Sequence, residues 1–178
     1  MEKETLKKIF DFLEENDNKR KPLMWKLKNN IPITEKDDLI VKGSLDLSSS
    51  NITSLPKGLE VKGSLILYES EIISLPEGLK VGGFLSLAGT KITSLPKDLQ
   101  VNGFLSLAQS DIESLPEGLS IGGSLNLSYC KEITLLPKGL EVGWNLNIRG
   151  TKLQKYTDDE LREMIKPGFI EWTIYRGE

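Results

Sequence analysis

The sequence predicts an α/β solenoid, in which short repeats stack and each repeat contributes a strand to one parallel β-sheet. Three observations predict this fold class. A Leu-x-Leu motif recurs about every 20 residues, a Leu-Pro turn follows every copy but the last, and segments of different character flank the array. A short fixed period is the signature of a stacked repeat protein. We therefore expect one structural domain with a helical N-terminal cap at 1–38, a repeat array at 39–153 and a C-terminal cap at 154–178.

The repeated motif predicts a short β-strand. In the second copy the apolar or small residues Val61, Gly63, Leu65 and Leu67 alternate with other residues. This period of two is typical of a half-buried strand whose leucines face the core. Successive copies begin 20, 20, 20, 20 and 21 residues apart, which places one extra residue within Tyr129–Glu132. The six copies are Leu45-Asp46-Leu47, Leu65-Ile66-Leu67, Leu85-Ser86-Leu87, Leu105-Ser106-Leu107, Leu125-Asn126-Leu127 and Leu146-Asn147-Ile148.

The segment after each strand predicts a tight return. Pro76 has no amide hydrogen to donate and Gly78 favours a turn, so the second copy cannot continue as a strand or form a long helix there. A unit of one strand and one return is too small to bury its own apolar side chains. Neighbouring units must therefore stack, with the six strands about 4.8 Å apart in one parallel sheet.

On these motifs the array resembles the bacterial-type leucine-rich-repeat family, over roughly Leu39 to Leu153. It is especially similar to the Ser-Leu-Pro-x-Gly-Leu-x-Val-x-Gly-x-Leu-x-Leu arrays of bacterial and phage proteins. The resemblance implies a right-handed superhelix. Where the family has an asparagine that bonds the backbone at the bend after the strand, this chain has serine or threonine, whose hydroxyls can make the same bond more weakly, and in one copy a cysteine. These residues are Ser50, Ser70, Thr90, Ser110, Cys130 and Thr151.

Both ends of the array carry segments that are suited to covering its exposed core. Apolar residues in Glu4–Glu15 follow the spacing of an amphipathic helix, and a second short helix is expected around Pro22–Lys28. After the array, Thr157 and Glu160 have the spacing of a capping box and predict a helix that ends before Pro167-Gly168. Aromatic and β-branched residues in Phe169–Tyr175 then predict a final strand, parallel to the others at the sheet edge.

The composition argues against several classes of function. Histidine is absent, which removes the commonest general base and metal ligand, and a net charge of −3 offers no field for binding nucleic acid. The N-terminus mixes apolar and charged residues, so we expect no signal peptide and no membrane span. We therefore expect a cytoplasmic protein without enzymatic activity, cofactor or metal, while secretion by a signal-independent route stays open.

The reactive or charged groups also have simpler structural interpretations. Cys130 occupies the Ser/Thr slot, and no histidine exists to activate its thiol. The basic residues around Trp25 are offset by the acidic residues of Asp11–Asp17, which favours a solvated surface over a nucleic-acid site. The residue after each Leu-Pro alternates in sign and predicts a ladder of weak surface pairs rather than catalytic carboxylates. These residues are Lys57, Glu77, Lys97, Glu117 and Lys138.

The outward face of the Leu-x-Leu strands is the candidate working surface. By parity, Phe84 and Phe104 are neighbours at its centre, beside Ile66 and Tyr68, within a nearly uncharged rim. An aromatic centre inside a polar rim is typical of protein contact surfaces. We expect the partner-binding residues to be Phe84, Phe104, Ile66, Tyr68, Ser86, Ser106, Asn126, Asn147 and Arg149.

The sequence thus predicts a protein-binding module whose partner is a protein of unknown identity. The family resemblance implies bacterial or phage origin and binding directed at host or defence proteins. Two alternatives stay open. The first is a structural repeat scaffold that self-associates, with the chain a monomer or a weak homodimer, and the second is a binder of glycans or another repetitive surface.

Overall fold

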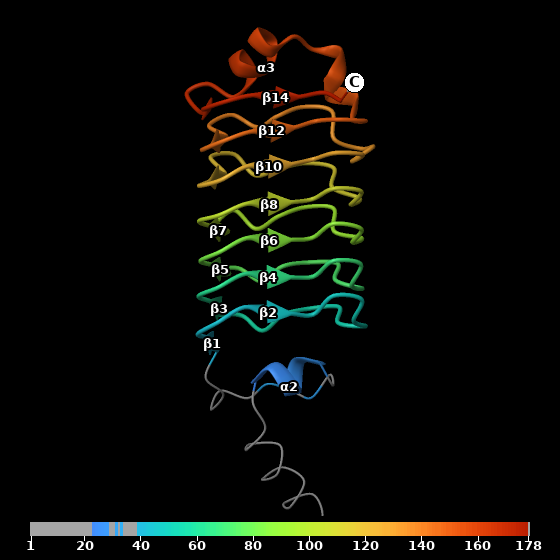
Figure 1. Cartoon of the computed structure of the whole chain (residues 1–178), viewed down its shortest axis with the longest axis vertical. Helices are drawn as coiled ribbons and strands as arrows, with labels where there is room; N and C mark the ends of the chain where they lie inside the picture. Colours follow the sequence, from blue (N-terminus) through green and yellow to red (C-terminus); the bar gives the residue numbers. More distant parts are fainter. Residues whose placement is uncertain (1–22, 29–30, 32, 34–38, 178) are drawn as a thin grey trace, which may run out of the picture.

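The chain folds as a parallel β-solenoid, which confirms the predicted solenoid architecture (Figure 1). A computed structural model describes residues 23–28, 31, 33 and 39–177. Each turn of the solenoid, here called a coil, contributes one two-residue strand to each of two seven-stranded parallel sheets. Sheet A contains β1 (Ile40–Val41), β3 (Glu60–Val61), β5 (Lys80–Val81), β7 (Gln100–Val101), β9 (Ser120–Ile121), β11 (Glu141–Val142) and β13 (Phe169–Ile170). Sheet B contains β2 (Leu45–Asp46), β4 (Leu65–Ile66), β6 (Leu85–Ser86), β8 (Leu105–Ser106), β10 (Leu125–Asn126), β12 (Leu146–Asn147) and β14 (Ile174–Tyr175).

The second sheet is a difference from the sequence prediction, which had one sheet. The alternating apolar run divides at a corner, so that Val61 belongs to sheet A and Leu65 to sheet B. Glycines stack at this corner. A Cβ atom built on Gly103 would lie 2.7 Å from the carbonyl oxygen of Gly83, and one built on Gly123 would lie 2.9 Å from the carbonyl carbon of Gly103. Such distances are shorter than van der Waals contact, so the close approach of successive corners favours glycine.

The core runs the length of the solenoid between the two sheets and the return segments. Leu65, Leu85 and Leu105 are fully buried, and each pairs in register with the same leucine of the next coil. The valine of sheet A and the isoleucine of the return segment, such as Val61 and Ile72, are also fully buried. The inward assignment of the Leu-x-Leu residues is therefore confirmed.

The Ser/Thr slot bonds the backbone as expected. The hydroxyls of Ser70, Thr90 and Ser110 donate to the carbonyl oxygen three residues earlier at 2.8, 2.7 and 2.6 Å. The backbone amide of each of these residues donates to the same oxygen, at 3.1, 3.3 and 3.0 Å. These bonds close the turn by which the chain leaves sheet B.

The two ends of the solenoid are capped differently. Helix α2 (Leu23–Lys28) lies beside the first coil and buries Leu27 (Figure 1), whereas the helix predicted at Glu4–Glu15 lies outside the described residues. At the other end come the 3-10 helix η1 (Lys152–Lys155) and helix α3 (Asp158–Met164). The predicted capping box of α3 is present, since Thr157 and Glu160 each accept the other's backbone amide.

The last segment lies parallel at the sheet edge as predicted, but as two strands. β13 extends sheet A and β14 extends sheet B, so Phe169–Tyr175 continues the coil pattern without a Leu-x-Leu motif. The guanidinium group of Arg162 on α3 donates to the carbonyl oxygens of Ile170 and Trp172. This side chain thereby satisfies carbonyl groups along the final edge, where an open sheet would invite pairing with another chain.

Candidate functional site

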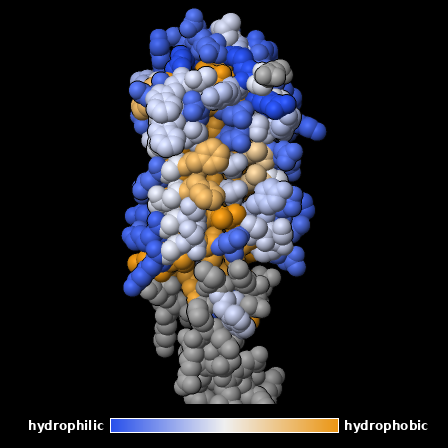
Figure 2. Space-filling view, viewed as in Figure 1, coloured by the Kyte–Doolittle hydropathy of each residue, from blue (hydrophilic) through white to orange (hydrophobic). Residues whose placement is uncertain are grey.

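The outer face of sheet B carries the predicted aromatic centre. Leu85 and Leu105 are partners in register, so Phe84 and Phe104 occupy the same slot of adjacent coils. The Phe84 side chain is 37% exposed, and Phe104 is half-buried. Figure 2 views this face and shows a hydrophobic area at mid-height, with hydrophilic side chains gathered on both margins.

Ile66 and Tyr68 extend this centre by one coil toward the N-terminal end. Ile66 is half-buried and lies in register with Ser86, and Tyr68 is exposed. The Tyr68 hydroxyl donates to a carboxylate oxygen of Glu69 at 2.6 Å, and this bond raises the pKa of Tyr68. The ring is thereby held at the margin of the face by a bond to the residue that follows it.

The small residues beside the aromatic centre offer unequal surface to a partner. Ser86 is half-buried, whereas Ser106 is only 7% exposed. In register, Ser106 lies between Ser86 and Asn126 of the two adjacent coils. Ser106 therefore has little side-chain surface for a contact.

Asn126 and Asn147 lie in register at the C-terminal half of the face, and both are half-buried. The Oδ1 atom of Asn126 accepts the amide of Ser128 at 2.9 Å, and that of Asn147 accepts the amide of Arg149 at 3.0 Å. Exposed Arg149 lies over the ring of Tyr129 at 5.6 Å from its centroid, which is a cation–π distance. This half of the face is thus polar with one positive charge.

Two tryptophans beside these asparagines were missed by the sequence analysis. Trp144 and Trp172 occupy the corner slot that earlier coils fill with glycine, and their side chains are 53% and 59% exposed. Their rings stack, with centroids 5.9 Å apart and planes 12° from parallel. The signal in the sequence was the substitution itself, since Trp144 stands where Gly103 and Gly123 stand in the preceding copies.

The predicted charge ladder is mostly absent. Lys57 and Glu77 form an exposed pair at 3.6 Å, but within 39–177 no ion pair joins Glu77, Lys97, Glu117 and Lys138 in succession. Charges pair instead on the return segments, where Lys91 meets Glu71 at 2.8 Å and Lys152 meets Glu132 at 3.2 Å. These exposed pairs lie off the outer face of sheet B.

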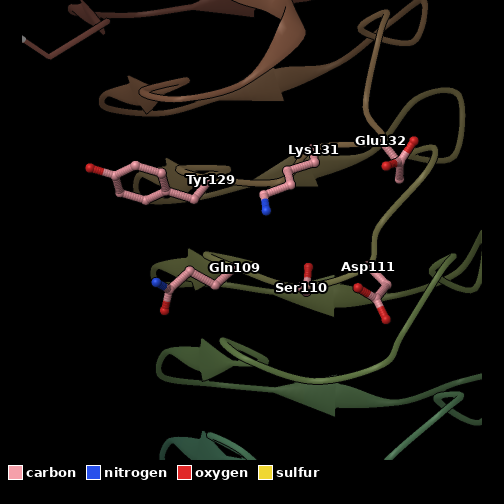
Figure 3. Close-up of a pocket in the computed structure, with 6 residues that line it drawn as sticks. All are labelled: Gln109, Ser110, Asp111, Tyr129, Lys131 and Glu132. Carbon is pink, nitrogen blue, oxygen red and sulfur yellow. The ribbon is translucent and has the colours of Figure 1, made fainter.

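The extra residue of the array opens a depression beside that face (Figure 3). Inward Ile133 follows Cys130 by three residues, whereas Ile112 follows Ser110 by two, so the insertion lies at Lys131–Glu132. The depression has a volume of about 410 Å³, and Figure 3 shows Tyr129 at one end, acidic side chains at the other and Lys131 between them. Its lining residues are Gln109, Ser110, Asp111, Tyr129, Lys131 and Glu132.

Cys130 lies in the core behind this depression. Its side chain is fully buried, and Sγ donates to the carbonyl oxygen of Leu107 at 2.9 Å. Burial raises the pKa of the Cys130 thiol, which keeps it protonated and a poor nucleophile. Across the described ranges there is also no cluster of three or more histidine, cysteine or acidic side chains suited to a metal ion.

Comparison of the sequence with models of known protein families and with curated proteins found no match in either set. In the part of the chain that the structure describes, no helix has the length and apolar character needed to cross a membrane.

Proposed function

We propose that this chain is a non-catalytic protein-binding module whose contact surface is the outer face of sheet B. The observation that carries the proposal is the distribution of side chains on the solenoid. Phe84, Tyr68, Trp144 and Trp172 are each more than a third exposed along one face or its corner, while the ion pairs Lys91–Glu71 and Lys152–Glu132 lie on the return segments. Exposed aromatic residues within a weakly charged surface are the usual anchors of protein contacts.

The parallel sheet suits this role because it is a rigid platform. Every strand of sheet B pairs with its neighbour in register, so the outward side chains of successive coils are held about 4.8 Å apart. The hydroxyl bonds at each turn fix the ends of the strands. Little conformational entropy is lost when a partner binds such a surface. We keep the leucine-rich-repeat family and a bacterial or phage origin as part of this proposal, on the sequence motifs alone.

Affinity capture with matched variants tests the proposal. The immobilised chain is exposed to a lysate of the source cells, in parallel with the double variant Phe84→Ala, Phe104→Ala and a control variant Ile73→Ala, Leu135→Ala. The control residues are each 58% exposed but lie on return segments. We expect the control to retain the captured protein and the face variant to lose it, with melting temperatures within roughly 5 °C of one another. Equal capture by both variants contradicts the proposal.

Light scattering separates the self-association alternative from binding to a different protein. A dimer that forms with increasing concentration and disappears in the Phe84→Ala, Phe104→Ala variant would make the second copy the occupant of this face. A chain that stays monomeric while the face variant loses its captured partner supports binding to another protein.

A further inference from the structure

The C-terminal half of the sheet B face presents hydrogen-bond donors, while its carbonyl acceptors each already accept a backbone amide. Asn126, Asn145 and Asn147, here called the amide cluster, each accept a backbone amide through Oδ1, at 2.9, 3.1 and 3.0 Å. Because only the carbonyl oxygen of an asparagine accepts, these bonds fix each side-chain amide with its NH2 group away from the backbone. The donor for Asn145 is Thr173 of the next coil.

The three NH2 groups of the amide cluster are available to a ligand. None of them donates to another described residue, and no buried side-chain nitrogen in the described residues is left without a partner. The NH2 groups therefore reach solvent. The backbone carbonyls of Trp144, Asn145 and Asn147 meanwhile accept amides of adjacent coils, at 3.1, 2.9 and 2.8 Å. A ligand on this surface thus meets amide donors and few free acceptors.

The aromatic rings beside the amide cluster are spaced for a regular extended ligand. Trp144 belongs to the coil of Leu146 and Phe104 to the coil of Leu105. Leu105 pairs with Leu125, and Leu125 pairs with Leu146, so the coil of Trp144 is the second one after the coil of Phe104. Two coils span about 9.6 Å at the usual strand spacing. One turn of a polyproline II helix spans about 9.3 Å, from three residues at about 3.1 Å each. Along the solenoid axis, the coils of Phe104 and Trp144 are therefore separated by about one turn of such a helix, with Trp144 one position nearer the corner.

We propose that the partner segment bound by this face is a proline-rich chain in the polyproline II conformation, lying along the solenoid axis across the amide cluster. Proline has a carbonyl acceptor and no amide donor, so it complements a surface that presents donors and has its carbonyl oxygens engaged. Aromatic-lined surfaces are the general mode for recognising this conformation, because the ligand is extended before it binds. The inference rests on the proposed function and names its ligand class.

The exposed tryptophans supply the apolar contact in this arrangement. Trp144 and Trp172 stack nearly parallel and each is more than half exposed, so the pair offers an apolar surface against which pyrrolidine rings can pack. The earlier coils fill the corner slot with glycine, so the fold has no need of a tryptophan there. An oligosaccharide would pack on the same rings, but each of its hydroxyl groups also carries a donor, whereas a proline residue carries only a carbonyl acceptor to match the NH2 groups.

The decisive variants change donors into acceptors without disturbing the turns. Asp46 occupies the slot of Asn126 and Asn147 in the first coil, and its Oδ1 atom accepts the amide of Ser48 at 3.0 Å. The double variant Asn126→Asp, Asn147→Asp therefore keeps both turn bonds and replaces two NH2 groups by oxygens. Thr93→Asp, on an exposed return segment, adds a negative charge away from the face and serves as the control.

The experiment titrates fluorescein-labelled decaproline with the full chain and follows its anisotropy, with a Gly-Ser decapeptide as the control ligand. We expect saturable binding of decaproline alone, weakened at least about tenfold by Asn126→Asp, Asn147→Asp and by Trp144→Ala, and unchanged by Thr93→Asp. Thermal melts of each variant show that it is folded. Equal binding by the aspartate variant, or competition by chitohexaose that depends on the same residues, overturns the proposal. If decaproline does not bind while capture still depends on Phe84 and Phe104, the ligand class is wrong and the proposed function stands.

Discussion

Substituting one corner glycine tests how closely the coils approach one another. In Gly103→Ala the new Cβ atom would lie 2.7 Å from the carbonyl oxygen of Gly83 and 2.8 Å from its carbonyl carbon. The shorter distance is about 0.7 Å below ordinary van der Waals contact, and backbone atoms cannot rotate away as a side chain can. The equivalent position in the first coil, Gly43, has no described atom within 4 Å of its Cβ position and gives a matched control.

The expected cost follows from the bond that crosses this contact. The amide of Gly103 donates to the same oxygen of Gly83 at 3.1 Å, so moving the coils apart by about 0.7 Å breaks a bond that contributes about 0.5–1.5 kcal/mol. Strain from overpacking adds about 1–3 kcal/mol to this destabilisation. Alanine also reduces the conformational entropy of the unfolded chain, which offsets about 0.4–1 kcal/mol of the loss. We expect a net loss of about 2 kcal/mol for Gly103→Ala.

Thermal and urea denaturation followed by circular dichroism measure the difference between the two variants. For a chain of this size, about 2 kcal/mol corresponds to a melting temperature lowered by roughly 4–8 °C. Gly43→Ala should melt at or slightly above the wild-type temperature. If Gly103→Ala is as stable as Gly43→Ala, the glycine corners do not approach one another as closely as described.

Three further predictions concern the core and the C-terminal cap. Leu105→Ala should lower the free energy of unfolding by about 2–5 kcal/mol, because the Leu105 side chain is fully buried. Leu135 is 58% exposed, so Leu135→Ala should lower it by less than about 0.5 kcal/mol. A loss below about 1 kcal/mol for Leu105→Ala would contradict its inward position. Cys130→Ser should change the melting temperature little, and Cys130 should react with a thiol reagent only after urea denaturation; rapid labelling of the folded chain would contradict its burial. Hydrogen bonds from Thr157 lower the pKa of the Glu160 carboxyl from its ordinary value. Its stabilisation is therefore present above the unfolded-state pKa and is lost as pH falls through the folded-state pKa. The difference in melting temperature between wild type and Glu160→Gln should therefore shrink between pH 6 and pH 3, and a constant difference would exclude the carboxylate's role.

Features with a local sequence signal could be predicted. The period of two in the Leu-x-Leu motif assigns Leu85 and Leu105 to the core and Phe84 and Phe104 to the surface, and the structure agrees. The capping box at Thr157 and Glu160 is a signal of four residues and is formed. Both rules depend only on geometry within one element, so they need no knowledge of the neighbouring coil.

Features that depend on contacts between coils were missed. The strand Lys80–Val81 is too short to show a period, and the corner that separates it from β6 follows from glycines stacked across coils. Trp144 lies at that corner, where strand parity assigns no direction to a side chain. The charges after each Leu-Pro were placed correctly at the surface, but which side chains reach one another depends on rotamers that the repeat spacing does not determine.

Site-specific photo-crosslinking tests the central claim most directly, because it reports which face of the solenoid contacts the partner. A benzophenone amino acid is placed at Ala88, on the outer face of sheet B, or at Ile73, on a return segment with 58% exposure. The account predicts that irradiation in lysate joins the captured protein to the chain labelled at position 88 and leaves the chain labelled at position 73 without it. Crosslinking of the same protein from position 73, with none from position 88, would contradict the assignment of the binding surface.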